Sequence, residues 1–197
     1  MPKDHSHEAA KLARRLLRPV REDIIALLQA LVRTDTTAVP PHGNETAGQK
    51  VLLKVLKSHG IDAWLYDTGF LEKSRHRLVR RERRYAGRAN LIAAIPGTDC
   101  GRSLLFSGHM DTVTASGKWR ESPFSGAIRG GRLYGRGAWD MKGGLAAHFG
   151  VLMALSRAGI KLKGDLFAES VVDEEWAGGG GTLAARLSGI TADACII

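Results

Sequence analysis

Cysteine is nearly missing from this sequence of 197 residues, which holds only Cys100 and Cys195. Two cysteines this far apart exclude a disulfide-based scaffold and a zinc site built from thiolates. No apolar run approaches the roughly 20 residues that span a bilayer, which excludes a membrane protein. The first 22 residues mix both charges and lack the apolar core of a secretory signal. We therefore expect a cytoplasmic protein.

Acidic residues are also scarce, because 20 Asp and Glu face 29 Lys and Arg, a net charge of +9. Most of the surplus lies in residues 73–88, where eight basic residues against Glu82 alone give a net charge of +7. Such a run is typical of an anion- or nucleic-acid-binding surface, or of a solvated loop. Tyr85 and His76 are its only rings, too few for base stacking, so nucleic acid is not the expected partner. We interpret the run as a basic insertion peripheral to the chemistry.

Two motifs of common enzyme classes are absent as well. No Gly-x-Ser-x-Gly elbow is present, so a serine hydrolase has no nucleophile here. The glycine run at 178–181 is not followed by Gly-Lys-Ser/Thr, which excludes a phosphate-binding P-loop. We expect these glycines to lead into a helix at 182–187.

The pattern of apolar residues predicts alternating helices and strands. Amphipathic periodicity predicts helices at 24–32, 45–59 and 141–157, the second with Asn44 as its N-cap and Gly60 just past its end. Short apolar runs predict strands at 62–67, 91–95, 103–107, 166–172 and 194–197. Near-continuous apolar runs are typical of strands covered on both faces. The sequence therefore predicts an α/β domain with a largely parallel sheet.

Polar residues follow the predicted strands at the point where ligands bind in such sheets. They are His109 and Asp111 after 103–107, Glu174 and Glu175 after 166–172, and Asp140 just before the helix at 141–157. Alone, each motif has an ordinary explanation: a chance His-x-Asp pair, a solvated acidic turn, a helix N-cap. Together they bring one imidazole and several carboxylates to one edge, which is a ligand set for Zn²⁺ or a similar ion.

The chemistry of these groups suggests which of them could bind metal and which could act as a base. Carboxylates packed side by side repel each other unless cations lie between them. A pair of metals could share one water and lower its pKa. One aspartate could bridge the metals, one glutamate of the adjacent pair could bind metal, and the other could act as general base. Asp111 is placed to orient His109.

Three ordered segments resemble the acetylornithine deacetylase, succinyl-diaminopimelate desuccinylase and aminoacylase family of zinc metallopeptidases. They are Ser107-Gly-His109-Met-Asp111-Thr-Val113, Tyr134-Gly-Arg-Gly-Ala-Trp-Asp140-Met-Lys-Gly-Gly144 and Asp173-Glu-Glu175-Trp-Ala-Gly-Gly179. The resemblance implies a three-layer αβα zinc-exopeptidase-like domain with a mostly parallel mixed sheet, incomplete at its C-terminus. It also implies a cis peptide bond between Asp140 and Met141.

The resemblance assigns a role to each candidate residue. His109 binds one metal, Glu175 binds the other, and Asp140 bridges both. Glu174 is the general base, and Asp111 orients His109. The implied cofactors are two divalent metal ions, zinc first, with cobalt or manganese as alternatives.

The implied function is metal-dependent hydrolysis of the amide bond of an N-acyl amino acid or a small peptide. Family members carry further ligands and a lid and dimerisation domain in later segments. We therefore expect residues 1–197 to be the N-terminal part of a metallohydrolase catalytic domain whose full-length form is a homodimer, with the activity of this part alone left open. The alternative is a non-catalytic remnant, or an anion- or nucleic-acid-binding module that acts through residues 73–88.

Overall fold

The computed structural model describes residues 6–197, so the first five residues of the charged N-terminal stretch lie outside it. The helices are α1 (Ser6–Leu17), α2 (Arg21–Arg33), α3 (Glu45–Ser58), α4 (Lys142–Ala158) and α5 (Thr182–Leu187), with short 3-10 turns at Arg18–Val20, Gly69–Lys73 and Glu174–Trp176. The strands are β1 (Ala38–Val39), β2 (His42–Gly43), β3 (Asp62–Asp67), β4 (Ala89–Ile95), β5 (Leu104–His109), β6 (Ala127–Arg129), β7 (Arg132–Tyr134), β8 (Leu166–Val171) and β9 (Ala194–Ile196). The predicted α/β fold is confirmed.

The main sheet has five strands in the order β3-β4-β8-β5-β9. Strand β5 runs parallel to both β8 and β9, whereas β4 runs antiparallel to both β3 and β8. The sheet is therefore mixed, as expected, but only two of its four pairings are parallel, so "mostly parallel" was wrong. The connection from β5 to its parallel partner β8 contains α4, and the connection from β8 through α5 brings β9 to the other side of β5.

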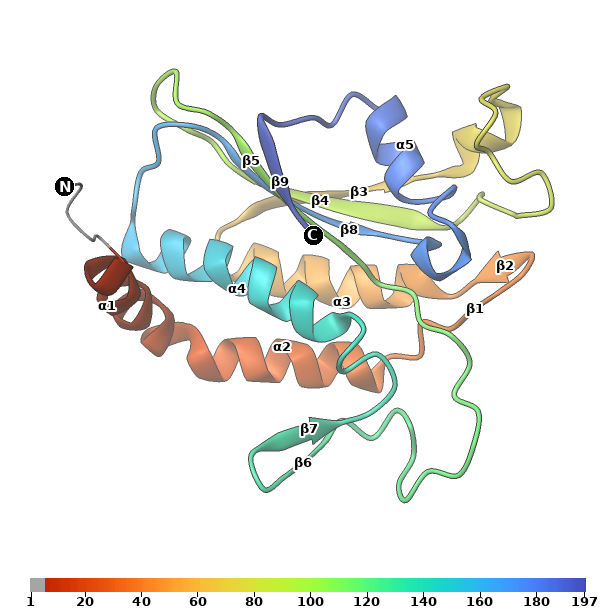
Figure 1. The fold of residues 1–197 in the computed structure, drawn as a ribbon, viewed down its shortest axis with the longest axis horizontal. Coiled ribbons are helices and arrows are strands. Elements are labelled where there is room, and N and C mark those ends of the chain that lie inside the picture. Colours follow the sequence, from red (N-terminus) through yellow and green to blue (C-terminus); the bar gives the residue numbers. More distant parts are fainter. Residues whose placement is uncertain (1–5) are drawn as a thin grey trace.

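Helices cover the two faces of this sheet unequally. Figure 1 shows α2, α3 and α4 beneath the sheet and α5 above it, the predicted αβα layers. The main core lies between the sheet and the larger helical layer, where Leu52 and Phe149 pack with Leu91, Phe106 and Ala168 of the central strands. Burial of this apolar area is the main term that stabilises the fold.

Glycines and local hydrogen bonds end the predicted helices where expected. Gly60 and Gly159 follow α3 and α4 with φ values of 67° and 63°, a left-handed conformation that glycine adopts without strain. Asn44 precedes α3 as predicted, but its side chain makes no cap hydrogen bond. The side-chain amide of Asn44 donates instead to the Asp35 carbonyl oxygen at 3.0 Å. This hydrogen bond connects the start of α3 to the loop that follows α2.

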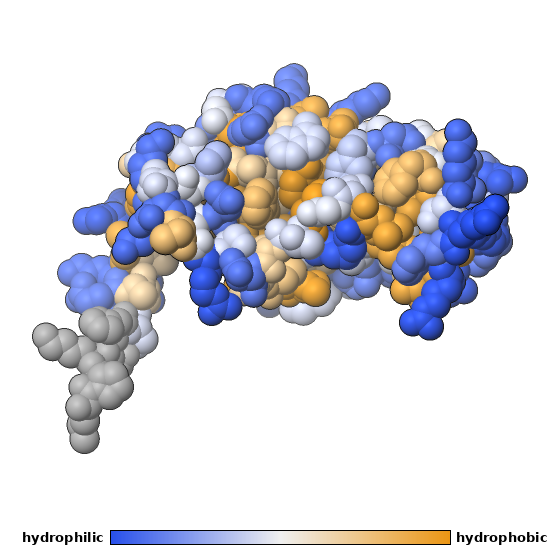
Figure 2. All heavy atoms as spheres, turned by 90° about the horizontal axis from the view of Figure 1, so that it is seen from above, coloured by the Kyte–Doolittle hydropathy of each residue, from blue (hydrophilic) through white to orange (hydrophobic). Residues whose placement is uncertain are grey.

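Strand β9 lies at the edge of the sheet and is exposed along its length, which corrects the prediction of a buried strand. Ile196 and Ile197 are 50% and 87% exposed. Figure 2, which looks down on the α5 side, shows apolar residues in the middle of this face among hydrophilic ones. Within residues 6–197, α5 is the one helix on this side of the sheet, so the cover is thin.

The basic segment 73–88 is largely a loop with most of its basic side chains exposed, as its charge predicts, but parts of it are buried in the fold. Val79 and Tyr85 are buried and pack with Leu71 and Ala184 in a second apolar cluster against α5. The side chains of Arg83 and Arg88 are only 2% and 4% exposed. Charge alone could not show this, because an arginine is buried only where a partner carboxylate meets it.

No helix among residues 6–197 combines the length and the apolar character needed to cross a membrane.

Candidate metal centre

Three separate segments bring the predicted site residues to one edge of the sheet. His109 is the last residue of β5 and is the register partner of Val171, the last residue of the parallel strand β8. The turns that leave these two strands therefore start side by side. Asp140 reaches the same place from the loop that precedes α4, and its peptide bond to Met141 is cis, as the resemblance implies.

The three predicted metal ligands lie within reach of one ion or an adjacent pair. One ligand atom each from His109, Asp140 and Glu175 lies within 4.8 Å of the others. The Nε2 atom of His109 is 3.1 Å from Oδ1 of Asp140 and 3.6 Å from Oε2 of Glu174. His109 is buried, whereas the side chains of Asp140 and Glu174 are more than half exposed, so the cluster opens to solvent.

The backbone of Asp111 orients the His109 ring. The Nδ1 atom of His109 lies 3.0 Å from the Asp111 carbonyl oxygen, which only accepts hydrogen bonds, so Nδ1 carries a proton. Nε2 then faces Asp140 and Glu174. Burial lowers the pKa of His109, but the hydrogen bonds and charge of Asp111 and the charge of Glu174 outweigh it and raise that pKa to about 9. A cation placed at Nε2 competes with that proton.

The Asp111 carboxylate holds the glutamate pair rather than the ring. Its two oxygens accept hydrogen bonds from the backbone N–H groups of Glu174 and Glu175, at 3.1 and 3.0 Å. The same oxygens lie no closer than 3.5 Å to Nδ1 of His109. Asp111 is fully buried, so one residue links the ends of β5 and β8 through both its carbonyl and its carboxylate.

A buried ion network adjoins the glutamate pair, and sequence patterns did not predict it. Asp173 adopts the left-handed conformation, with φ of 67°, and its Oδ1 atom accepts hydrogen bonds from Arg83 and, at 2.9 Å, from Arg88. Arg88 also forms an ion pair with Glu45 at the start of α3. The two partners of each of these ion pairs lie 43 to 90 positions apart in the chain, so no local spacing could have revealed the network.

Negative charge accumulates at the open side of the centre. Burial raises the pKa of Glu175, and the charges of Asp140, Asp111 and Glu174 raise it further, although His109 opposes them. Crowded carboxylates of this kind are stabilised by a cation between them. The donor set of one fixed imidazole nitrogen and several carboxylate oxygens is one that Zn²⁺, Co²⁺ or Mn²⁺ accepts. The residues present therefore fit a divalent metal.

Comparison with known sequences agrees with the resemblance expected from the three sequence segments. Residues 105–197 match the profile of the peptidase family M20/M25/M40. An N-formyl-4-amino-5-aminomethyl-2-methylpyrimidine deformylase of Halalkalibacterium halodurans is 33% identical over 181 residues, which cover 90% of this chain and 38% of that protein. A succinyl-diaminopimelate desuccinylase of Methylobacterium radiotolerans is 39% identical over 127 residues, covering 61% and 32% of the two chains.

Solved structures of the family share the fold. Human carnosine dipeptidase 1 superposes with a TM-score of 0.68 at 18% identity, covering 92% of this chain and 39% of its own. The aminopeptidase PepT of Bacillus cereus gives a TM-score of 0.57 at 26% identity, covering 81% and 38%. The chain thus spans about two fifths of the length of the relatives it matches.

The profile match contains His109, Asp111, Asp140 and the glutamate pair, the same residues that converge in space. The resemblance expected from the three sequence segments is confirmed: residues 105–197 match the peptidase family M20/M25/M40, and the two relatives are similar over 90% and 61% of this chain.

Proposed function

We propose that this chain carries the metal-binding and proton-transferring part of a hydrolase that cleaves the amide bond of an N-acyl amino acid or a small peptide. The observation that carries the proposal is the convergence of His109, Asp140 and Glu175, with the Glu174 carboxylate 3.6 Å from the His109 ring. Two relatives are named for removing an acyl group, formyl in one and succinyl in the other, which supports the reaction class.

The residues present suggest how two divalent ions would be held. His109 would bind one, Glu175 the other, and Asp140 both, with zinc the expected metal and cobalt or manganese as substitutes. When bound, such ions polarise an amide carbonyl and lower the pKa of water. Asp111 is a positioning residue, because it contacts His109 and the backbone of the glutamate pair.

Glu174 is proposed as the general base. Its carboxylate is 52% exposed, so it can reach a water molecule at the open side of the centre. The carboxylate would take one proton from water as the water oxygen bonds to the amide carbon. It would then give that proton to the amide nitrogen as the C–N bond breaks. The residue ends unchanged, and the products are a carboxylic acid and an amine.

Replacement of the base separates catalysis from metal binding. In the full-length enzyme, we expect Glu174→Gln to retain the metal content and to lower the turnover of an N-acyl amino acid by about a hundredfold or more. Elemental analysis measures the first and an assay of released amine measures the second. Glu22→Gln, an exposed change on α2, is the control for both readings.

Normal turnover by Glu174→Gln would remove the proposed base, and loss of metal would make Glu174 a ligand instead. A protein that neither binds zinc nor hydrolyses amides would favour the non-catalytic alternative. The homodimer, the cytoplasmic setting and the assignment of residues 1–197 to one partial catalytic domain stay predictions.

A further inference from the structure

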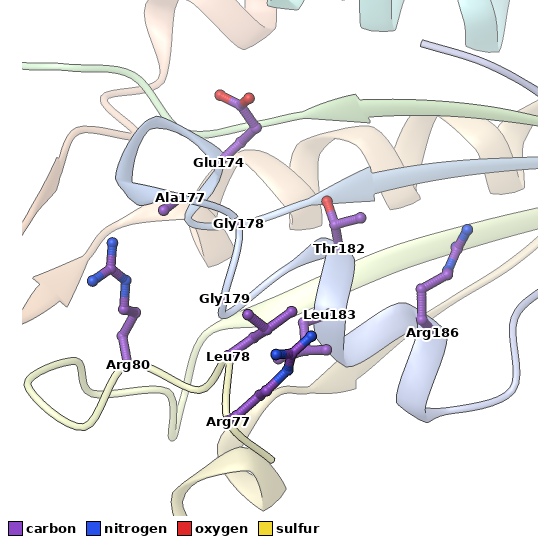
Figure 3. A pocket seen from close by; sticks show the side chains of 10 residues that line it. All are labelled: Arg77, Leu78, Arg80, Glu174, Ala177, Gly178, Gly179, Thr182, Leu183 and Arg186. Carbon is purple, nitrogen blue, oxygen red and sulfur yellow. The ribbon is translucent and has the colours of Figure 1, made fainter.

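A cavity of about 640 Å³ opens beside the metal centre, with Glu174 on its wall. Figure 3 shows that the rest of its lining comes from three segments: the basic segment supplies Arg77, Leu78 and Arg80, the turn after Glu174 supplies Ala177, Gly178 and Gly179, and α5 supplies Thr182, Leu183 and Arg186. The guanidinium of Arg80 points toward the turn that carries Ala177. The Glu174 carboxylate points away from Arg77 and Arg80 (Figure 3), so the cavity extends from the back of the turn that carries the proposed base to these arginines.

The positive charge in this cavity is only partly balanced. Arg186 donates to the buried Glu169 carboxylate at 2.7 Å, so its charge is compensated from within the fold. Arg80 has only the exposed Glu82, at 3.8 Å. No carboxylate among residues 6–197 lies within 4 Å of the Arg77 guanidinium. Arg77 and Arg80 are thus the cations free to meet an anion, with Glu174 the single acid on the wall.

The backbone of Arg80 is held in place by hydrogen bonds. The Tyr85 hydroxyl accepts from the Arg80 N–H and donates to the Arg80 carbonyl, both at 3.1 Å. The Glu72 carboxylate accepts from the N–H groups of Tyr85 and Ala86, at 2.9 and 3.2 Å. A preorganised backbone lowers the entropy lost when a ligand binds.

A second cavity lies on the other side of Arg80, where Glu82 and Glu175 match the charges of Arg80 and Arg83. This space of about 410 Å³ shares Arg80 and Ala177 with the first cavity and is lined also by Arg83 and Glu175. Arg83 is buried and pairs with Asp173 through Nη2, but its Nε and Nη1 atoms have no hydrogen-bond partner among the described residues. Buried donors of this kind are normally satisfied by a ligand or by water.

We propose that Arg77 and Arg80 form a subsite for an oxyanion of the substrate, a carboxylate placed away from the scissile amide. The inference rests on the proposed function for its substrate and on the cavity geometry for its location. Guanidinium groups bind carboxylates through paired, charge-assisted hydrogen bonds. The basic segment, on this account, selects acyl amino acids or peptides that carry an extra negative charge.

Calorimetric titration of the protein with succinate tests binding directly, with zinc present and again after chelation. We expect binding in both conditions, weakened about tenfold by Arg77→Ala or Arg80→Ala and unchanged by Arg132→Ala, an exposed arginine of β7. Equal affinity in all variants would overturn the subsite. Because this measurement does not require turnover, it stands even if the amidohydrolase assignment fails.

Matched substrates show whether the anion belongs to the substrate. One pair compares N-succinyl with N-succinamyl amino acids, and a second compares a free amino-acid carboxylate with its primary amide. Arg80→Ala should raise the KM of the charged member of one pair about tenfold and leave its kcat within about twofold. The KM of the neutral member should not change. If inorganic phosphate binds at Arg77 and Arg80 but both pairs behave as in the unsubstituted protein, the site serves a free anion and the substrate proposal is wrong.

Discussion

Arg88 joins the start of α3 to the turn that carries the glutamate pair. Its guanidinium pairs with Glu45 and with Asp173, and all three side chains are at most 4% exposed. Burial raises the pKa of Glu45, while the hydrogen bond and charge of Arg88 oppose that shift. Removing one member of such a group leaves the others charged and without a partner in a poorly hydrated place.

We therefore expect Arg88→Ala to lower the free energy of unfolding by about 3–5 kcal/mol. Urea unfolding followed by circular dichroism measures the loss. Arg21→Ala is the matched control, because its pair with Glu22 is exposed and contributes little. A loss for Arg88→Ala no larger than that of the control would show that the buried network does not hold the turn.

At the scale of elements, α4 and β5 meet through an aromatic contact that carries a titratable group. The His148 ring of α4 stacks on Phe106 of β5, with centroids 5.0 Å apart and planes at 14°. The His148 Nδ1 atom is buried without a hydrogen-bond partner among the described residues. Burial lowers the pKa of His148 below its usual value of 6.5, because the charged ring loses hydration there.

This contact predicts an acid-sensitive contribution to stability. A depressed histidine pKa means that the unfolded chain takes up the proton first, so the contribution is present above pH 6.5 and is lost as the pH falls through the folded-state pKa. We expect His148→Leu to flatten the fall in unfolding free energy between about pH 7 and pH 5. Urea titrations across this range measure the slope, with His7→Leu on the exposed helix α1 as the control. An unchanged slope would place the acid sensitivity elsewhere.

Over the whole molecule, the charges separate into an acidic centre and a basic wall beside it. Asp140, Glu174 and Glu175 face solvent around His109, whereas Arg77 and Arg80 line the neighbouring cavity. The chain's net charge of +9 therefore conceals a local surplus of carboxylates at the site. A cation at that centre would remove the repulsion between these carboxylates and stabilise the folded state.

Zinc should raise the melting temperature of the protein, and chelation should lower it. Binding to the folded state alone adds about 2.7 kcal/mol when free metal is a hundredfold above its Kd. Differential scanning calorimetry with zinc or with a chelator measures the shift. We expect His109→Ala to abolish it, while Arg132→Ala, an exposed change on β7 at a residue that is not a proposed ligand, should retain it. A shift that survives in His109→Ala would mean that zinc binds elsewhere.

Local patterns in the sequence were sufficient for the strands of the main sheet and for the helices packed on it, but not for α1 or the short strands β1, β2, β6 and β7. They also selected the residues that converge at the candidate site. The apolar runs predicted β3 and α5 at their observed bounds and the other main elements to within a few residues, because periodicity reports which face of a segment is buried. The spacing of His109, Asp140 and Glu175 after or before these elements indicated a shared edge, since the ends of parallel strands meet there.

Only the tertiary structure decided the direction of β4, the exposure of β9 and the state of the basic segment. An antiparallel pairing leaves no mark in a short apolar run, and an edge strand differs from a central one only by its neighbours. Charge counts treat all eight basic residues of 73–88 alike. The fold divides them, because Asp173 and Glu45 meet Arg83 and Arg88 in the interior and leave Arg77 and Arg80 facing the cavity. Contacts across 43 to 90 residues made that division, and a linear pattern does not contain them.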